Sequence, residues 1–157
     1  MIDGVPHSMS PSPGTAHQRF SLILASQILN TMLNSKDSCK DCTVLQDIDW
    51  LIADDTVMCP DISIVCDHKT NYITTIPVLL IEIVSPTSGL RDRIVKYDMY
   101  QGQGVKYYII ADPATGTYTA YQIIDGKYQE YSLATFAIHE GCTLTIDVAK
   151  ALTEIGK

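Results

Sequence analysis

The strongest constraint on the fold is the proline-bounded run Pro77-Val-Leu-Leu-Ile-Glu-Ile-Val-Ser-Pro86. Its centre is almost continuously apolar, which is typical of a strand buried on both faces of a sheet. One carboxylate, Glu82, falls near the C-terminal end of this strand. Because an ionised carboxylate is costly to bury alone, Glu82 needs a cation or a proton beside it. A Lys or Arg partner, or exposure at the strand end, would satisfy Glu82 equally well, so its role depends on what else converges there.

Three segments have helical patterns. An apolar stripe predicts a helix to about Asn34, opened by Thr15-Ala-His-Gln18 in the form of a capping box. A second helix is expected from about Leu90 to Gln101, where Gly102 and Gly104 would end it. A short terminal helix should begin at about Asp147.

Extended patterns fill most of the remaining chain. They predict strands at residues 44–53, 56–66, 75–84, 105–111, 116–124, 127–131, 135–138 and 142–146. Pro60 inside the second run favours an edge position, a bulge or a break just before Asp61. The strand–helix–strand unit from Thr75 to Ala111 implies a parallel crossover, and the strands before it can form an antiparallel meander. We therefore expect an α/β fold, a mixed β-sheet flanked by helices.

Length and composition are those of an ordinary globular chain. The 157 residues fit one domain, with residues 1–14 as an N-terminal arm, and 46% of them are hydrophobic and 18% charged. No apolar run reaches the roughly eighteen residues that a membrane helix needs, and the N-terminus lacks the pattern of a signal peptide. A soluble cytoplasmic protein is the expectation.

The cysteines do not suggest a disulfide framework, because their count is odd and their spacing irregular. They are Cys39, Cys42, Cys59, Cys66 and Cys142. The motif Cys39-Lys-Asp-Cys42 is a lone C-x-x-C without the further ligands of a zinc site. We expect it to lie in an exposed loop and the other three cysteines to be small core residues.

Three polar residues form a candidate catalytic constellation. Asp61 lies in an otherwise apolar strand, Glu82 near the end of the next strand, and Lys96 on the helix that follows. If the two strands are neighbours, the carboxylates meet at one edge of the sheet, where they repel unless a proton or cation is shared. Hard carboxylate oxygens favour Mg²⁺ or Mn²⁺, and such an ion with a nearby lysine is what phosphodiester hydrolysis requires.

The order of these residues resembles the PD-(D/E)XK superfamily of restriction-endonuclease-like nucleases. More narrowly, nearly the whole chain, from about residue 5 to about residue 146, is similar to the Uma family, whose members are classed with restriction endonucleases. The matching segments are His17, Pro60-Asp-Ile-Ser-Ile-Val65, Leu80-Ile-Glu-Ile-Val-Ser-Pro86, Lys96-x-x-x-Tyr100 and Gly104-Val-Lys-Tyr-Tyr-Ile-Ile-Ala-Asp-Pro113.

The resemblance implies a Mg²⁺-dependent (or Mn²⁺-dependent) endonuclease that acts on DNA. Asp61, Glu82 and the backbone carbonyl of Ile83 would bind the metal, and Lys96 would assist the attacking water, with support from His17 and Tyr100. The chain departs from the superfamily at Val84, where a lysine usually stands two residues after the acid. In families like this one the neighbouring helix is thought to supply the lysine, which points to Lys96.

Each of these residues also has a structural interpretation. Lys96 could pair with Asp92 one helical turn earlier, and Tyr100 could be a packing residue. His17 should tend to stay neutral near a helix N-terminus, where it could accept a proton, bind near the metal, or merely cap or pack. Asp47 and Asp49 are expected to face solvent.

Two other functions stay open. One is a nucleic-acid-binding or regulatory module of the same fold with a weak or absent metal site. It is favoured by Val84 and by the net charge of −7, from 11 basic and 18 acidic residues, because nonspecific nucleic-acid binding rests on phosphate neutralisation. The other is a carbohydrate hydrolase that uses the carboxylate pair, which one Trp supports poorly. A homodimer is expected by analogy alone.

Overall fold

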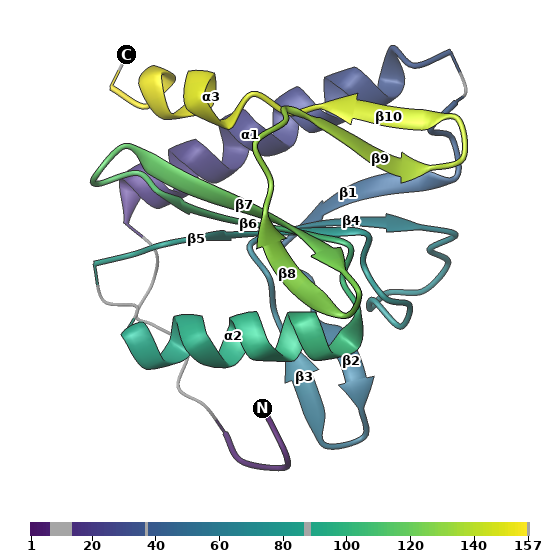
Figure 1. Cartoon of the computed structure of the whole chain (residues 1–157), viewed down its shortest axis with the longest axis vertical. Coiled ribbons are helices and arrows are strands. Elements are labelled where there is room, and N and C mark those ends of the chain that lie inside the picture. Colours follow the sequence, from purple (N-terminus) through teal and green to yellow (C-terminus); the bar gives the residue numbers. More distant parts are fainter. Residues whose placement is uncertain (7–13, 37, 87–88, 157) are drawn as a thin grey trace.

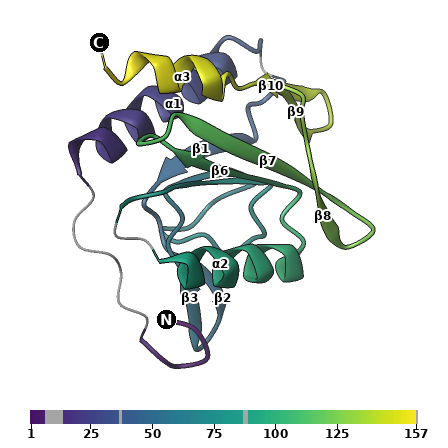
Figure 2. The ribbon, with the colours of Figure 1, turned by 60° about the vertical axis from the view of Figure 1, so that its left-hand side comes forward.

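A six-stranded mixed sheet with helices on both faces forms the centre of the molecule (Figure 1). The structure, a computed structural model, describes residues 1–6, 14–36, 38–86 and 89–156. Helices α1 (Thr15–Leu33) and α3 (Val148–Glu154) cover one face of the sheet, and α2 (Leu90–Gln103) covers the other (Figure 2). The predicted α/β class is confirmed.

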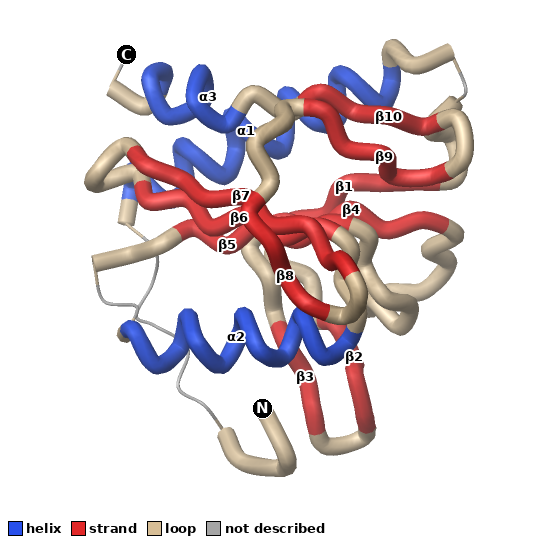
Figure 3. Tube along the Cα trace, viewed as in Figure 1, coloured by secondary structure: helices blue, strands red, loops and turns tan. Residues whose placement is uncertain are grey.

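The strands of the large sheet are arranged in the order β1-β4-β5-β6-β7-β8. They are β1 (Cys42–Gln46), β4 (Ile62–Cys66), β5 (Leu79–Ile83), β6 (Tyr107–Asp112), β7 (Thr117–Ile124) and β8 (Lys127–Glu130). Only β5 and β6 pair in parallel, with α2 as their connection, so the predicted crossover is confirmed. Two small antiparallel pairs, β2–β3 (Trp50–Ala53 with Thr56–Met58) and β9–β10 (Thr135–His139 with Cys142–Thr145), lie beside this sheet (Figure 3).

Two of the predicted strands are each divided in two. The run 44–53 ends as β1 at Gln46 because Asp47 adopts a positive φ of 51°, and the chain resumes as β2 at Trp50. The run 56–66 breaks at Pro60, which has no N–H to donate to a ladder, and Asp61 follows at a bend. At the two breaks, Asp47 and Asp61 lie outside the regular strands.

The first helix begins differently from the prediction. Its N-cap is Gly14, without a side-chain hydrogen bond, and Thr15 is already the first helical residue. The predicted capping box is therefore wrong, since the Thr15 hydroxyl stands one position too late to cap. Part of the predicted N-terminal arm lies outside the described residues, and residues 1–6 run beside β3 through backbone hydrogen bonds.

The sheet separates two apolar cores of different character. The core under α1 and α3 is mainly aliphatic, with Ile62, Ile64 and Ile81 fully buried beneath Phe20 and Leu24. The core under α2 is rich in aromatic residues; those that are buried include Trp50, Tyr100, Tyr108 and Tyr128. β4 and β5 contribute alternate side chains to both cores, which is why their apolar runs are nearly continuous.

Two disulfides overturn the prediction for the cysteines. Cys39 is bonded to Cys142, and Cys42 is bonded to Cys66 in the facing strand. Lys40 and Asp41 of the C-x-x-C motif are exposed in a turn, as expected, but Cys39 is buried and each cysteine of the motif pairs with a distant partner. Cys59 is the free, half-buried thiol. Disulfides are typical of oxidising compartments, so these two do not support the predicted cytoplasmic localisation. That localisation stays a prediction.

Membrane insertion by a helix finds no support in the described part of the chain, where no helix is long and apolar enough to cross a bilayer.

Candidate functional site

Asp61 and Glu82 lie opposite each other on neighbouring strands. The antiparallel register of β4 and β5 pairs Ile62 with Ile81, so the next pair toward the edge consists of Asp61 and Glu82. Asp61 follows the break at Pro60, and Glu82 is the penultimate residue of β5. The structure thus brings the two predicted carboxylates together at one edge of the sheet.

Asp61 is held by a backbone N–H and by a histidine ring. Its Oδ2 accepts a hydrogen bond from the backbone N–H of Ile83 at 2.6 Å, and its Oδ1 lies 3.2 Å from Nε2 of His17. His17 stands in the first turn of α1, which brings it to the Asp61 carboxylate. The Asp61 side chain keeps 18% of its surface exposed. The candidate site is therefore open to solvent on the Asp61 side.

Glu82 is almost completely buried, with 6% of its surface exposed, and each of its oxygens has a partner. Oε2 lies 2.7 Å from Nζ of Lys96, and Oε1 accepts a hydrogen bond from the Tyr100 hydroxyl at 2.6 Å. Lys96 and Tyr100 are one turn apart on α2, so one helical face serves both oxygens. Lys96 also lies 3.6 Å from the exposed carboxylate of Asp92, the partner expected for a plain surface pair.

Burial and ion pairing act against each other around Glu82. Burial raises the pKa of Glu82 to about 7, although Lys96 works in the opposite direction. Burial would lower the pKa of Lys96, but the adjacent Glu82 carboxylate outweighs it and raises that pKa. Burial also raises the pKa of the Tyr100 hydroxyl far above its ordinary range. Lys96 is therefore a cation and Tyr100 a proton donor at neutral pH.

His17 has one satisfied and one unsatisfied ring nitrogen. The hydrogen bond with Asp61 raises the pKa of His17 above its usual value, while burial lowers it. Nδ1 is buried and has no hydrogen-bond partner among the described residues. An N–H at Nδ1 would be an unpaired buried donor, so when the ring is neutral this geometry suits the tautomer that donates from Nε2 to Asp61.

The backbone of Ile83 faces the same point. Its N–H bonds Asp61, whereas the N–H of Val84 bonds Ala111 in β6 on the other side of the strand. In extended backbone the N–H and C=O of one residue project to the same side, so the Ile83 carbonyl is directed toward β4. This orientation makes the carbonyl available beside the two carboxylates.

The donor set is suited to a hard cation. In the parts of the chain that the structure describes, no group of three or more His, Cys, Asp or Glu side chains is arranged to hold a metal. Mg²⁺, however, is commonly bound by one or two carboxylates and keeps several waters. Asp61, Glu82 and the Ile83 carbonyl supply only oxygen donors, so their chemistry fits Mg²⁺ or Mn²⁺ better than zinc.

Asp47 lies next to the candidate site, which the prediction of a solvent-facing side chain did not include. It is exposed, as is Asp49, but its backbone N–H donates to the Asp61 carbonyl at 3.2 Å. Burial and the nearby Asp61 raise the pKa of Asp47, while His17 lowers it. The available signal was an Asp at the end of a strand, where this residue type tolerates a left-handed conformation.

Comparisons with known proteins agree with the fold and motif pattern. A family model, Uma2, described as "Putative restriction endonuclease", matches residues 1–147. A solved structure described as a "putative nuclease belonging to DUF820 from Anabaena variabilis ATCC 29413" is similar, with a TM-score of 0.70 and 16% identity over 92% of this chain and 86% of that one. No curated protein matches the chain. At that identity the structural likeness speaks for the fold.

Proposed function

Because the chain belongs to the Uma2 family, we propose that it is a metal-dependent endonuclease that hydrolyses phosphodiester bonds in DNA. The observation that carries the proposal is the 2.7 Å contact between Lys96 and Glu82. Val84 occupies the position where related nucleases carry their lysine, and Lys96 brings an ammonium group to the same edge of the sheet from α2.

Asp61, Glu82 and the Ile83 carbonyl would hold the metal, which we propose to be Mg²⁺ or Mn²⁺. When bound, such an ion lowers the pKa of a coordinated water and stabilises charge on the phosphoryl oxygens. Asp61 would offer the more accessible oxygens, because its side chain is partly exposed and no lysine among the described residues is paired with it. Glu82 would supply the buried, fixed donor.

Lys96 is suited to donate hydrogen bonds rather than to accept a proton. Its raised pKa keeps the ammonium charged, so it would orient the attacking water or stabilise negative charge on the phosphate. Tyr100 would fix Glu82 through its 2.6 Å hydrogen bond. His17 would orient Asp61 in the same way from α1. Both act through the carboxylates.

DNA as the substrate agrees with the local distribution of charge. The chain is acidic overall, but Arg91, Arg93 and Lys96 fall within the first two turns of α2, the helix from which Lys96 reaches Glu82. Cations near the scissile position can bind substrate phosphates although the net charge is −7. Cleavage of both strands would be served by a homodimer, which light scattering after size-exclusion chromatography tests.

A second candidate is a nucleic-acid-binding module without catalysis. The observation in its favour is that Lys96 and Tyr100 together contact both oxygens of Glu82. A structural ion pair of this kind would leave the fold intact and the site inert. The two candidates differ in whether a divalent ion binds.

Calorimetric titration of Mg²⁺ and Mn²⁺ into the wild type and Asp61→Ala separates them. The nuclease proposal expects binding in the millimolar range or tighter in the wild type, and binding at least about 10-fold weaker in the variant. A wild type that binds neither ion at millimolar concentration removes the mechanism. Asp54→Ala, a change at an exposed turn residue, is the matched control and should bind as the wild type does.

A cleavage assay on supercoiled, linear and single-stranded DNA follows. Glu82→Ala and Lys96→Ala should each lower the rate by about 100-fold or more, since each removes a group proposed to touch the metal or the reacting phosphate. Equal activity in wild type and Glu82→Ala would mean that the cleavage arises elsewhere.

A further inference from the structure

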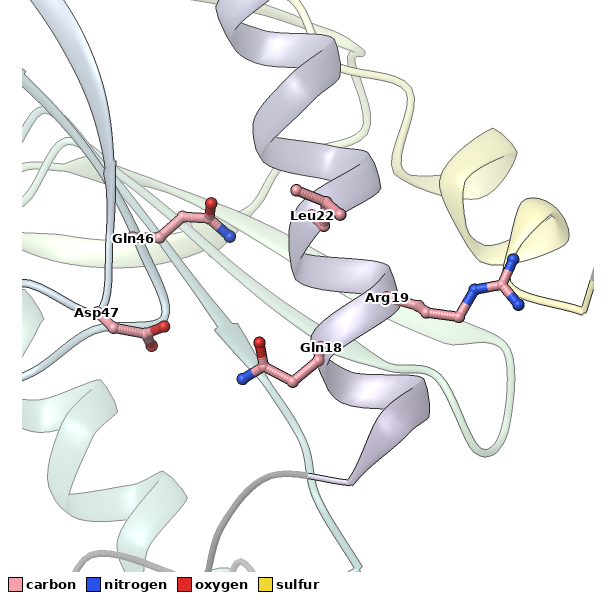
Figure 4. Close-up of a pocket in the computed structure, with 5 residues that line it drawn as sticks. All are labelled: Gln18, Arg19, Leu22, Gln46 and Asp47. Atoms are coloured by element: carbon pink, nitrogen blue, oxygen red, sulfur yellow. The ribbon is translucent and has the colours of Figure 1, made fainter.

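A pocket of about 290 Å³ lies between the N-terminal half of α1 and the end of β1. Its lining consists of Gln18, Arg19, Leu22, Gln46 and Asp47 (Figure 4). Gln18 extends from the helix toward β1, and Gln46 at the end of β1 and Asp47 directly after it extend toward the helix. Arg19 points to the other side of α1. The groups that point into the pocket are therefore two amides and a carboxylate, and no cation points into it from Arg19.

The pocket adjoins the candidate catalytic centre. Gln18 directly follows His17, whose imidazole lies 3.2 Å from Asp61. Asp47 donates its backbone N–H to the Asp61 carbonyl at 3.2 Å. Two lining residues are thus joined, by sequence or by a hydrogen bond, to the proposed metal ligand Asp61 or to His17, which orients it. A nucleotide next to that phosphate would have its base within reach of the pocket.

One of the recognition groups is fixed in place. Nε2 of Gln46 donates a hydrogen bond to the hydroxyl of Ser21 at 2.7 Å, and Ser21 is itself buried in the face of α1 that packs on the sheet. This bond uses one N–H of the amide and sets the direction of its carbonyl. Recognition by a side chain held in this way costs less conformational entropy than recognition by a free one.

The lining also offers a flat ring an apolar surface. Leu22 is 61% exposed and is the apolar side chain among the polar residues that line the pocket. Phosphate is a poor occupant, because Asp47 would repel it and Arg19 points away. A nucleobase combines an apolar face with donors and acceptors on its edge, which matches an exposed leucine bordered by amides and a carboxylate.

We infer that this pocket between α1 and β1 receives a nucleobase flanking the scissile phosphate and favours adenine or cytosine over thymine. Asp47 accepts hydrogen bonds only, so it pairs with an exocyclic amino group and opposes the carbonyl edge of thymine. Gln18 offers both a donor and an acceptor, which a base edge with an amino group and a ring nitrogen can satisfy. The inference rests on the proposed nuclease function.

Mapping the cut ends of a mixed-sequence DNA tests this in wild type, Gln18→Ala and Asp47→Ala. The wild type should prefer adenine or cytosine over thymine by about 5-fold or more at one fixed position beside the cut. Each variant should reduce that ratio to below about 2-fold, whatever its overall rate. Gln129→Ala, an exposed glutamine on β8 at the other edge of the sheet, should keep the wild-type ratio. Cleavage without a base preference, or a preference unchanged in both variants, would overturn the inference.

A binding measurement separates this inference from the nuclease proposal. Fluorescence anisotropy with short single-stranded dA, dC and dT oligonucleotides in EDTA requires no catalysis. We expect dA or dC to bind about 5-fold or more tightly than dT, and Gln18→Ala to abolish the difference. If the wild type cuts no DNA but discriminates in this way, the nuclease proposal fails and the pocket stands. Equal binding of all three oligonucleotides, whether or not DNA is cut, would overturn the inference that the pocket selects a nucleobase.

Discussion

The two carboxylates of the candidate centre are held from opposite faces of the same sheet. Asp61 is held from α1, through His17, and by a backbone N–H of β5. Glu82 is held from α2, by the Lys96 ammonium and the Tyr100 hydroxyl. The Asp61 side is partly exposed and has, within the described chain, no lysine or arginine paired with the aspartate, whereas the Glu82 side is buried and paired with a cation.

This difference indicates a division of labour. A buried ion pair is expensive to break, because whichever charge remains is left without compensation. Bonds from a backbone amide and a histidine ring hold Asp61 more weakly and leave part of it in water. We therefore expect the Glu82 side to govern stability and the Asp61 side to adapt to metal and substrate.

Replacing Lys96 should cause the largest loss of stability on the Glu82 side. In Lys96→Met the aliphatic stem remains but Glu82 loses its cation, and the free energy of unfolding should fall by about 3 kcal/mol at pH 8. At pH 5 the loss should be much smaller, because Glu82, with a pKa of about 7, can be neutral. Urea denaturation in EDTA at the two pH values measures both losses.

Lys127→Met is the control, since Lys127 is exposed on β8. Its change should stay within about 0.5 kcal/mol at either pH. Equal losses for the two lysine variants would mean that the Lys96–Glu82 pair contributes nothing to stability.

The Lys96 contact also marks what the sequence could predict. The continuous apolar run at β5, the glycine stop of α2 at Gly104 and the strand–helix–strand order are local patterns found in the structure, although α2 continues through Gly102 to Gln103. The meeting of Asp61 and Glu82 required only that the two strands be neighbours. The sequence places Tyr100 and Lys96 on one helical face, but it does not show that both contact Glu82. Tertiary packing decides which strand residue lies beneath that face.

The failures occur where distant or conformational information decides. Cys39 and Cys142 are 103 residues apart, and no spacing rule pairs them. Cys42 and Cys66 become partners only through the register of β1 and β4. The left-handed turn at Asp47 left no apolar signal, so the division between β1 and β2, and with it the pocket beside Asp61, could not be read from alternation.

Raising the pH should weaken the metal-free protein. Glu82 has a folded pKa of about 7 against an ordinary value of 4.5, so its contribution to stability is full below pH 4.5 and is lost as the pH rises through 7. His17, whose pKa is also raised, acts with the same sign, from about pH 6.5 upward. We expect the free energy of unfolding in EDTA to fall by on the order of 2 kcal/mol between pH 5 and pH 8.

Urea titrations in EDTA across this pH range measure the slope. Glu82→Gln should flatten it, because the titrating carboxyl on the buried side has been removed. A stability that rises with pH in the wild type would mean that Glu82 is ionised at lower pH than its burial suggests.

Removing the Tyr100 hydroxyl should have a smaller effect on the same side. Tyr100→Phe leaves Oε1 of Glu82 without its 2.6 Å hydrogen bond, at a cost of about 1.5 kcal/mol when the carboxylate is charged. Tyr128→Phe is the matched control, since that buried hydroxyl donates to the neutral carbonyl of Val105 at 3.0 Å. The Tyr100 loss should grow from pH 5 to pH 8 and the Tyr128 loss should not. Parallel pH profiles for the two variants would contradict a charged acceptor at Glu82.

Replacing His17 should cost least in stability, because it acts on the open side. His17→Ala removes one hydrogen bond to a partly exposed carboxylate, and we expect a loss of about 1 kcal/mol or less in EDTA. If His17 orients Asp61 as proposed, the variant should still bind Mn²⁺ about 3- to 10-fold more weakly by calorimetry, since an orienting partner influences affinity through its ligand. His139→Ala, at an exposed position of β9, should change neither quantity. A stability loss for His17→Ala as large as that for Lys96→Met would erase the difference between the two sides, and unchanged Mn²⁺ affinity would reduce His17 to a packing residue.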